Sequence, residues 1–158
     1  ENETVEGLEY SAKSMPYREG DILLTDCSSN FLTRPIDWQK ISMAYAHTQK
    51  NCGISGSTIM IVHEKLIEMP KLHNTPTVAT IDSTSKDTQA TDRHPPIYMN
   101  RLLLKYVKQQ GGPRFYNEHC RTRSNKLYDV IDGSHGFYNG VARKDWRSRI
   151  NVTWRMET

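Results

Sequence analysis

Residues 43–62, MAYAHTQKNCGISGSTIMIV, hold two short apolar runs separated by a polar segment that contains glycine. The first run is residues 43–46, and the second is residues 57–62, which is rich in β-branched side chains. A third run, residues 21–26, precedes them and follows the turn signal Arg18-Glu19-Gly20. Short apolar runs without polar alternation are typical of strands buried on both faces, so we expect a sheet of the α/β class.

Two helices are expected after these strands. Residues 71–94, rich in Thr, Ser, Asp and Lys, show no clear period and are interpreted as a loop. Pro95-Pro96 then begins a helix that ends at Gly111-Gly112, and a second helix runs from about Pro113 to Ile131. The side chains that we expect these helices to bury are Ile97, Leu102, Leu103, Tyr106 and Val107 in the first, and Phe115, Leu127, Val130 and Ile131 in the second.

The two ends of the sequence alternate weakly between apolar and polar residues. Residues 4–10 are a candidate for one more strand. Residues 148–156 predict a strand with Ile150, Val152 and Trp154 on one face.

Composition excludes several classes of protein. The 158 residues fit one ordinary domain, but only 36% are hydrophobic, which indicates surface covered by a partner or a loosely ordered segment. The net charge of +3 is mild, and no Lys/Arg run with interleaved aromatics indicates nucleic acid. No apolar stretch approaches the roughly 18 residues of a membrane span. The histidines and cysteines lack the spacing of metal ligands, so no metal site is expected.

The three cysteines, Cys27, Cys52 and Cys120, do not form a disulfide pattern, because their number is odd and their spacing is wide. We interpret them as reduced thiols in an intracellular compartment, and cytoplasm, mitochondrion and plastid all suit them. Cys27 with His47 or His135 would also suit a thiol hydrolase, but a packed thiol is the preferred interpretation.

An acid and a lysine follow two of the expected strands. Asp26 stands where the first clear strand stops, and Gln49-Lys50-Asn51 follows the second. Ligands of open α/β sheets bind at the carboxyl ends of the strands, so both side chains would face one crevice. An enzyme that uses pyridoxal phosphate (PLP) needs such a pair. The lysine forms a Schiff base with the cofactor aldehyde, and the carboxylate keeps the pyridine nitrogen protonated.

The sequence motifs around these two residues resemble motifs of the phosphoserine aminotransferase family. Residues 26–37, DCSSNFLTRPID, are similar to the family's DMSSNFLSRPID, and residues 45–53, YAHTQKNCG, are similar to its YAGAQKNxG. Residues 2–7 match NETxxG. Late in the chain, residues 127–132 and 147–152 are similar to LYDxID and RSRMNV, and GFY follows the first of these. The words keep their order and approximate spacing from Asn2 to Arg155.

The resemblance implies a role for each matching residue. Lys50 would carry the cofactor and act as general acid and base, and Asp26 would pair with the pyridine nitrogen. Thr4 would contact the cofactor near its phenolic oxygen or phosphate, and Gln49 would contact the phosphate. The implied reaction moves an amino group between glutamate and 3-phosphohydroxypyruvate in serine biosynthesis.

The sequence departs from the family in two motifs. Residues 92–97, DRHPPI, stand in place of YNTPPT, whose Asn-Thr pair reaches the PLP phosphate of the other subunit. Arg93 or His94 could bind that phosphate instead, but loss of the contact is the preferred interpretation. His47 replaces a glycine that precedes the lysine, so its ring is expected to crowd the cofactor pocket.

The resemblance also implies the fold: part of the large PLP-binding domain of a fold-type I aminotransferase, with a mostly parallel sheet and helices, running into the small C-terminal domain. Residues 1–132 would belong to the large domain, and residues 133–158 to the linker and first strand of the small domain. Family segments before and after these words are absent from the sequence, so activity of this chain alone is not expected. A homodimer or other protein subunits would complete the fold, and a catalytically inactive structural subunit of a larger assembly is the alternative.

Overall fold

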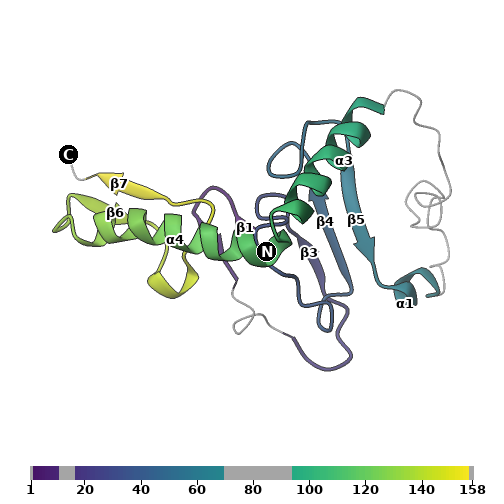
Figure 1. The fold of residues 1–158 in the computed structure, drawn as a ribbon. Coiled ribbons are helices and arrows are strands. Elements are labelled where there is room, and N and C mark those ends of the chain that lie inside the picture. The colour runs from purple at the N-terminus through teal and green to yellow at the C-terminus, as the bar shows by residue number, and fades with distance from the viewer. Residues whose placement is uncertain (1, 11–16, 70–93, 157–158) are drawn as a thin grey trace.

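The computed structural model describes residues 2–10, 17–69 and 94–156 of the chain (Figure 1). Three small sheets and two long helices make up this part of the molecule. The elements follow in the order β1 (Asn2–Glu3), β2 (Leu8–Glu9), β3 (Leu24–Asp26), β4 (Met43–His47), β5 (Thr58–Val62), α1 (Glu64–Ile67), α3 (His94–Gln109), α4 (Gly112–Asp132), β6 (Tyr138–Gly140), the 3₁₀ helix η2 (Lys144–Trp146) and β7 (Trp154–Met156).

The sheet β3-β4-β5 confirms the three strands expected from the apolar runs. β3 pairs with β4 in parallel, with Asp26 opposite Tyr45, and β5 pairs with β4 antiparallel, with Thr58 opposite His47. β3 is shorter than residues 21–26, because residues 21–23 make no strand pairing. The carboxyl ends of β3 and β4 therefore lie next to each other, as the predicted site requires.

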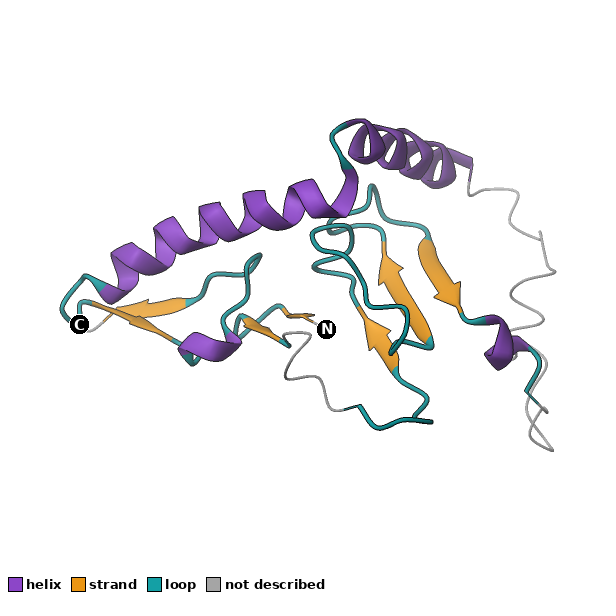
Figure 2. Ribbon diagram, turned by 60° about the horizontal axis from the view of Figure 1, so that its bottom comes forward, coloured by secondary structure: helices purple, strands orange, loops and turns teal. Residues whose placement is uncertain are grey.

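Only one face of this sheet is covered among the described residues. Ala44 and Ala46 on that face are 1% and 0% exposed, and Leu103 of α3 packs against the core cluster that contains them. Figures 1 and 2 show α3 lying against the sheet. Leu24 and Met60 are 53% and 43% exposed, so burial on both faces was the wrong expectation for this part of the chain.

Both expected helices are present, but most of their expected buried residues are exposed. In α3 only Val107 is buried, and Leu103 is half-buried, while Ile97, Leu102 and Tyr106 are exposed. In α4 the buried residues are Cys120, Ser124, Tyr128 and Ile131; of the four predicted, only Ile131 is among them. The buried face of α4 therefore differs from the predicted apolar stripe and includes the hydroxyl-bearing Ser124 and Tyr128. No helix in the described ranges is long and apolar enough to cross a membrane.

The chain ends differ from the two expected long strands. Residues 2–10 form β1 and β2, two short antiparallel strands joined by a turn at Gly7, rather than one strand. The φ of Gly7 is +70°, and a Cβ there would lie 2.5 Å from the carbonyl oxygen of Asn151. Only Trp154–Met156 of the predicted 148–156 strand is a strand, paired with β6. The segment before it lies against residues 2–9 instead. The predicted 71–94 loop lies outside the described residues, except that His94 begins α3.

The segment from β6 to β7 packs along the far end of α4 (Figure 1). The Arg147 guanidinium makes two hydrogen bonds of 2.7 and 2.9 Å to the carboxylate of Asp132, which ends α4. The guanidinium also lies 4.4 Å from the centre of the Tyr128 ring. Arg147, with Lys144, holds the pKa of Asp132 at about 2. A paired carboxylate and a stacked guanidinium thus fix the C-terminal hairpin to the helix.

Buried hydrogen bonds hold the turn that follows β4. Thr48 is fully buried, and its Oγ1 donates to the carbonyl oxygens of Ile54 and Ser57. The Asn100 amide of α3 lies 2.7 Å from the Ser57 hydroxyl. With the amide oriented to satisfy both of its polar atoms, it also donates to the carbonyls of Cys52 and Pro96. The segment that carries Lys50 is therefore fastened to α3.

Gly53→Ala tests this fastening. Gly53 has a φ of +137°, and a Cβ there would lie 2.5 Å from a terminal atom of the Asn100 amide. We expect the substitution to lower the free energy of unfolding by about 2–3 kcal/mol, because it adds a steric clash to backbone strain. Chemical denaturation measures the change. Gly20→Ala is the control: Gly20 has a φ of +90° but no neighbour within 4 Å, so it should cost only about 1 kcal/mol. Equal losses would contradict the proposed role of Asn100.

Candidate active site

The Lys50 amine lies beside a hydroxyl from the opposite end of the sequence. Lys50 is exposed in the turn after β4, and its Nζ donates to Thr4 Oγ1 at 2.9 Å. Thr4 Oγ1 also lies 2.8 Å from the Ser29 hydroxyl. Ser29 in turn donates to the carbonyl oxygen of Asn2 at 3.2 Å. Three segments therefore meet at the lysine: β1 and its turn, the loop after β3, and the turn after β4.

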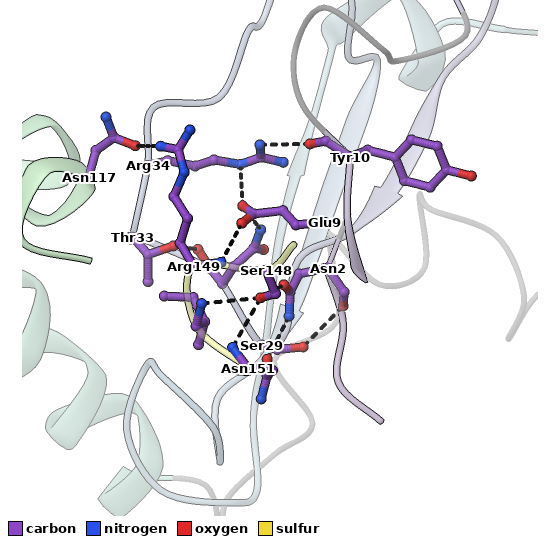
Figure 3. A network of polar contacts seen from close by, with 12 residues as sticks. Asn2, Glu9, Tyr10, Ser29, Thr33, Arg34, Asn117, Ser148, Arg149 and Asn151 are labelled. Atoms are coloured by element: carbon purple, nitrogen blue, oxygen red, sulfur yellow. Dashed lines mark hydrogen bonds and ion pairs between the residues drawn. The ribbon is translucent and has the colours of Figure 1, made fainter. Parts of the chain in front are cut away.

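A buried polar network, drawn in Figure 3, holds Asn2 and with it the strand that leads to Thr4. Asn2, two residues before it, donates from Nδ2 to Asn151 Oδ1 at 2.7 Å and accepts a hydrogen bond from the Ser148 hydroxyl at Oδ1. Ser148 is fully buried, and its backbone N–H donates to the carbonyl oxygen of Gly7 at 2.8 Å. The backbone N–H of Asn151 donates to the Ser148 hydroxyl at 3.0 Å. The C-terminal segment thus fixes the strand that presents Thr4.

Glu9 is the centre of the same network. Its side chain is 5% exposed, and its carboxylate forms an ion pair of 3.2 Å with Nε of Arg34. It also accepts from Asn30 Nδ2 at 3.2 Å and from the backbone N–H of Arg149 at 3.0 Å. Figure 3 shows Glu9 between the Arg34 and Arg149 segments. A buried carboxylate is tolerated when its charge and its acceptor sites are matched in this way.

Asp26 ends β3 and is half-buried. Burial alone would raise its pKa. Three hydrogen bonds act against burial: they come from the Ser28 backbone, the Ser28 side chain and the Tyr45 side chain. Together with the charge of His47, they lower the pKa of Asp26 below its ordinary value. The Ser28 N–H lies 2.8 Å from Asp26 Oδ1. The carboxylate is therefore ionised at neutral pH, and it can pair with a cationic ring nitrogen.

His47 stands at the end of β4. Its backbone N–H donates to the Ser28 hydroxyl at 2.9 Å, and its ring Nδ1 lies 2.8 Å from Thr58 Oγ1. The ring is exposed and meets the Tyr45 ring edge to face, with centroids 6.2 Å apart. Whether the imidazole crowds a bound cofactor stays a prediction.

Of the remaining predicted site residues, only Gln49 lies wholly within the described part of the chain. Gln49 is exposed beside Lys50. Arg93 lies outside the described residues, and the side chain of His94 is likewise not described, although its backbone begins α3. The structure thus brings together Lys50, Thr4 and, through adjacent serines, Asp26.

The serines Ser28 and Ser29 are the functional residues that sequence reasoning missed. Both are 7% exposed, and they connect Asp26, His47 and Thr4 by hydrogen bonds. The signal was present, since both belong to the DCSSN word that follows Asp26. Glu3 was also missed. Its carboxylate accepts from the backbone N–H groups of Val5 and Glu6, which lower its pKa, with a smaller contribution from the charge of Lys50.

Two clefts along α4 contain none of the predicted site residues. One, of about 440 Å³, is lined by apolar and polar side chains of α3, α4 and the 149–152 segment. The other, of about 460 Å³, is lined mostly by charged residues. Its arginines already have partners; they are Arg34, Arg121, Arg147 and Arg149. Neither cleft competes with the Lys50 region as a site of chemistry. Among the described residues, no group of three or more His, Cys, Asp or Glu side chains could hold a metal ion.

Comparison with known proteins adds to this geometry. Residues 3–156 match the family described as aminotransferase class-V. The chain is 37% identical over 158 residues to a phosphoserine aminotransferase of Niallia circulans, which covers 98% of this chain and 42% of that protein. The chain therefore spans about two fifths of the length of the curated relatives that it matches.

Solved structures give the same result. A phosphoserine aminotransferase from Bacillus circulans subsp. alkalophilus superposes with a TM-score of 0.86 at 36% identity, over 99% of this chain and 43% of that one. A PLP-bound phosphoserine aminotransferase from Trichomonas vaginalis superposes with a TM-score of 0.84 at 28% identity, over 98% and 42%. These similarities confirm the predicted fold class, an α/β segment of a fold-type I aminotransferase.

The electrostatic environment of Asp26 can be measured directly. We expect the carbon-13 signal of its carboxyl group to titrate below the ordinary Asp pKa of about 3.9. Because the pKa of Asp26 is lowered in the folded state, the stability that Asp26 contributes is present when the pH is above the ordinary pKa. It is lost as the pH falls through the pKa of the folded state. Tyr45→Phe should raise the pKa, since it removes a side-chain hydrogen bond. Tyr98→Phe, on the exposed part of α3, should not change it. An unchanged titration in Tyr45→Phe would refute this account of the site.

Proposed function

The chain belongs to the aminotransferase class-V family, and from that premise we propose that it carries the cofactor-binding residues of a PLP-dependent phosphoserine aminotransferase. The reaction proposed is the transfer of an amino group between glutamate and 3-phosphohydroxypyruvate, a step of serine biosynthesis. The names of the relatives, at 33–37% identity over nearly the whole chain, support this choice of reaction.

The contact between Lys50 and Thr4 is the observation that carries the proposal. The Lys50 amine is held 2.9 Å from the Thr4 hydroxyl, in the turn after β4. The neighbouring strand, β3, ends in the ionised carboxylate of Asp26. PLP has an aldehyde, which needs an amine, and a pyridine nitrogen, which needs an acid. The residues present fit both requirements. Bound PLP would supply an electron sink for the substrate's α-carbon.

Lys50 is proposed to have two tasks at its Nζ atom. The amine would bond the cofactor, and once released it would accept and return the proton of the substrate's α-carbon. Thr4 orients the amine, because its hydroxyl is itself held by Ser29. The exposed position of Lys50 leaves the amine accessible for both tasks.

Asp26 is proposed to keep the ring nitrogen protonated. Its lowered pKa leaves a carboxylate that forms an ion pair with that nitrogen. Gln49, exposed next to Lys50, is proposed to bind the phosphate, and Arg93 and His94 remain candidates for the same group.

The uncovered face of the β3-β4-β5 sheet supports a proposal about partners. Leu24 and Met60 on that face and Ile22 before β3 are more than 40% exposed, and apolar patches of this kind mark interaction surfaces. We propose that a second copy of the protein or another protein segment covers this face.

The proposed boundary of the large domain lies at residues 132 and 133. The three free, buried cysteines support an intracellular location.

Reductive trapping tests the role of Lys50. Incubation with PLP followed by borohydride should leave a stable adduct on the peptide that contains Lys50, because reduction fixes the bond between the amine and the aldehyde. Lys50→Ala and Lys50→Arg should lose at least about nine tenths of this adduct. Lys40→Ala, which removes a half-exposed lysine paired with Asp37, should retain it. Peptide mass spectrometry measures the adduct. Equal labelling in Lys50→Ala would reject the site.

The reaction itself needs a second measurement. This chain alone is not expected to be active, so the assay uses the chain joined to the family segments that would precede and follow it. Loaded with PLP, that protein should pass the amino group of glutamate to 3-phosphohydroxypyruvate, and phosphoserine is measured by mass spectrometry. Lys50→Ala in it should reduce this rate by about 10³-fold or more, since it removes the group that moves the proton. An adduct at Lys50 without amino transfer in the completed protein would leave cofactor binding in place and reject the proposed activity.

A further inference from the structure

One face of the sheet gathers the polar side chains at the ends of the strands. Asp26 is opposite Tyr45 in the register of β3 and β4, so the two side chains lie on the same face. His47 follows Tyr45 by two residues and shares that face, and Thr58 of β5 is opposite His47. His47 is thus a diagonal neighbour of Asp26. The two side chains are close enough for the charge of His47 to contribute to the lowered pKa of Asp26.

The imidazole of His47 is held in a defined orientation. Its Nδ1 lies 2.8 Å from Thr58 Oγ1, and its ring edge meets Tyr45. A hydroxyl both donates and accepts, so Thr58 can hold Nδ1 in either protonation state of the ring. Below the ring, the backbone N–H of His47 bonds to the Ser28 hydroxyl, and the N–H of Ser28 bonds to Asp26. Ser28 thus fixes His47 and Asp26 relative to each other.

The second ring nitrogen of His47 is available to a ligand. No atom in residues 2–10, 17–69 or 94–156 makes a hydrogen bond to Nε2, and the side chain is exposed. In His47, one ring nitrogen is oriented by a partner, and the other is open on a face that carries an ionised carboxylate. This arrangement is common for a histidine that contacts a ligand.

We propose that His47 is a further ligand-contacting residue of this site, whose Nε2 contacts the ring of a pyridine ligand that Asp26 holds by its ring nitrogen. The proposal rests on the proposed function, because PLP is the pyridine ligand in question.

The test measures the affinity for PLP, by the quenching of tryptophan fluorescence. His47→Ala should weaken binding by about threefold to tenfold, the worth of one polar contact. His47→Gln keeps a polar group, so it should bind PLP more tightly than His47→Ala does. Thr58→Val frees the His47 ring, so its affinity for PLP should lie between those of wild type and His47→Ala. His135→Asn, in the turn after α4, is the control and should match wild type.

A spectroscopic measurement separates contact from indirect effects. Addition of PLP to wild-type protein should shift the nitrogen-15 resonance of His47 Nε2 more than that of Nδ1. If the His47 variants match wild type in affinity while wild type forms the Lys50 adduct, the His47 contact is refuted and the proposed function stands. If wild type forms no Lys50 adduct and binds no PLP, the proposed function fails and this inference is withdrawn with it.

Discussion

The buried carboxylate of Glu9 is the constraint on which the rest of the arrangement depends. A charge with 5% exposure is stable only if other groups balance it, and Arg34, Asn30 and the backbone of Arg149 do so. These partners come from the loop after β3 and from the C-terminal segment, and Glu9 comes from the N-terminal strands. One ion and its hydrogen bonds thus join three parts of the sequence, and the hydroxyls of Thr4 and Ser29 are positioned as a result.

Two kinds of force build the candidate site from this framework. The sheet brings the ends of β3 and β4 together by backbone pairing, which fixes Asp26 next to Tyr45. Buried hydrogen bonds of Thr48 and Asn100 then hold the turn that presents Lys50. The amine and the carboxylate are themselves only partly buried, so the surrounding shell provides the rigidity. A site built in this way keeps its reactive groups accessible and its geometry fixed.

Local signals gave the elements but not their buried faces. Apolar runs predicted β4 and β5 closely, and the proline and glycine punctuation predicted both long helices. The apolar stripes then misled, since Phe115, Leu127 and Val130 are exposed while Ser124 and Tyr128 are buried. Tyr128 is buried because its hydroxyl donates to the carbonyl oxygen of Ser148. Periodicity cannot register such a contact, because it records hydrophobicity along one helix and not the partner that the helix meets.

The sequence by itself determined the fold class, the family, and the pairing of a lysine with an acid at adjacent strand ends, because motif words and short apolar runs are local properties of the chain. Only the tertiary structure decided that Thr4 holds Lys50, that Ser28 joins Asp26 to His47, and that Thr58 orients the His47 ring. These contacts join residues up to 46 positions apart. Their existence depends on strand register and on the buried charge of Glu9, and both arise only when distant segments meet.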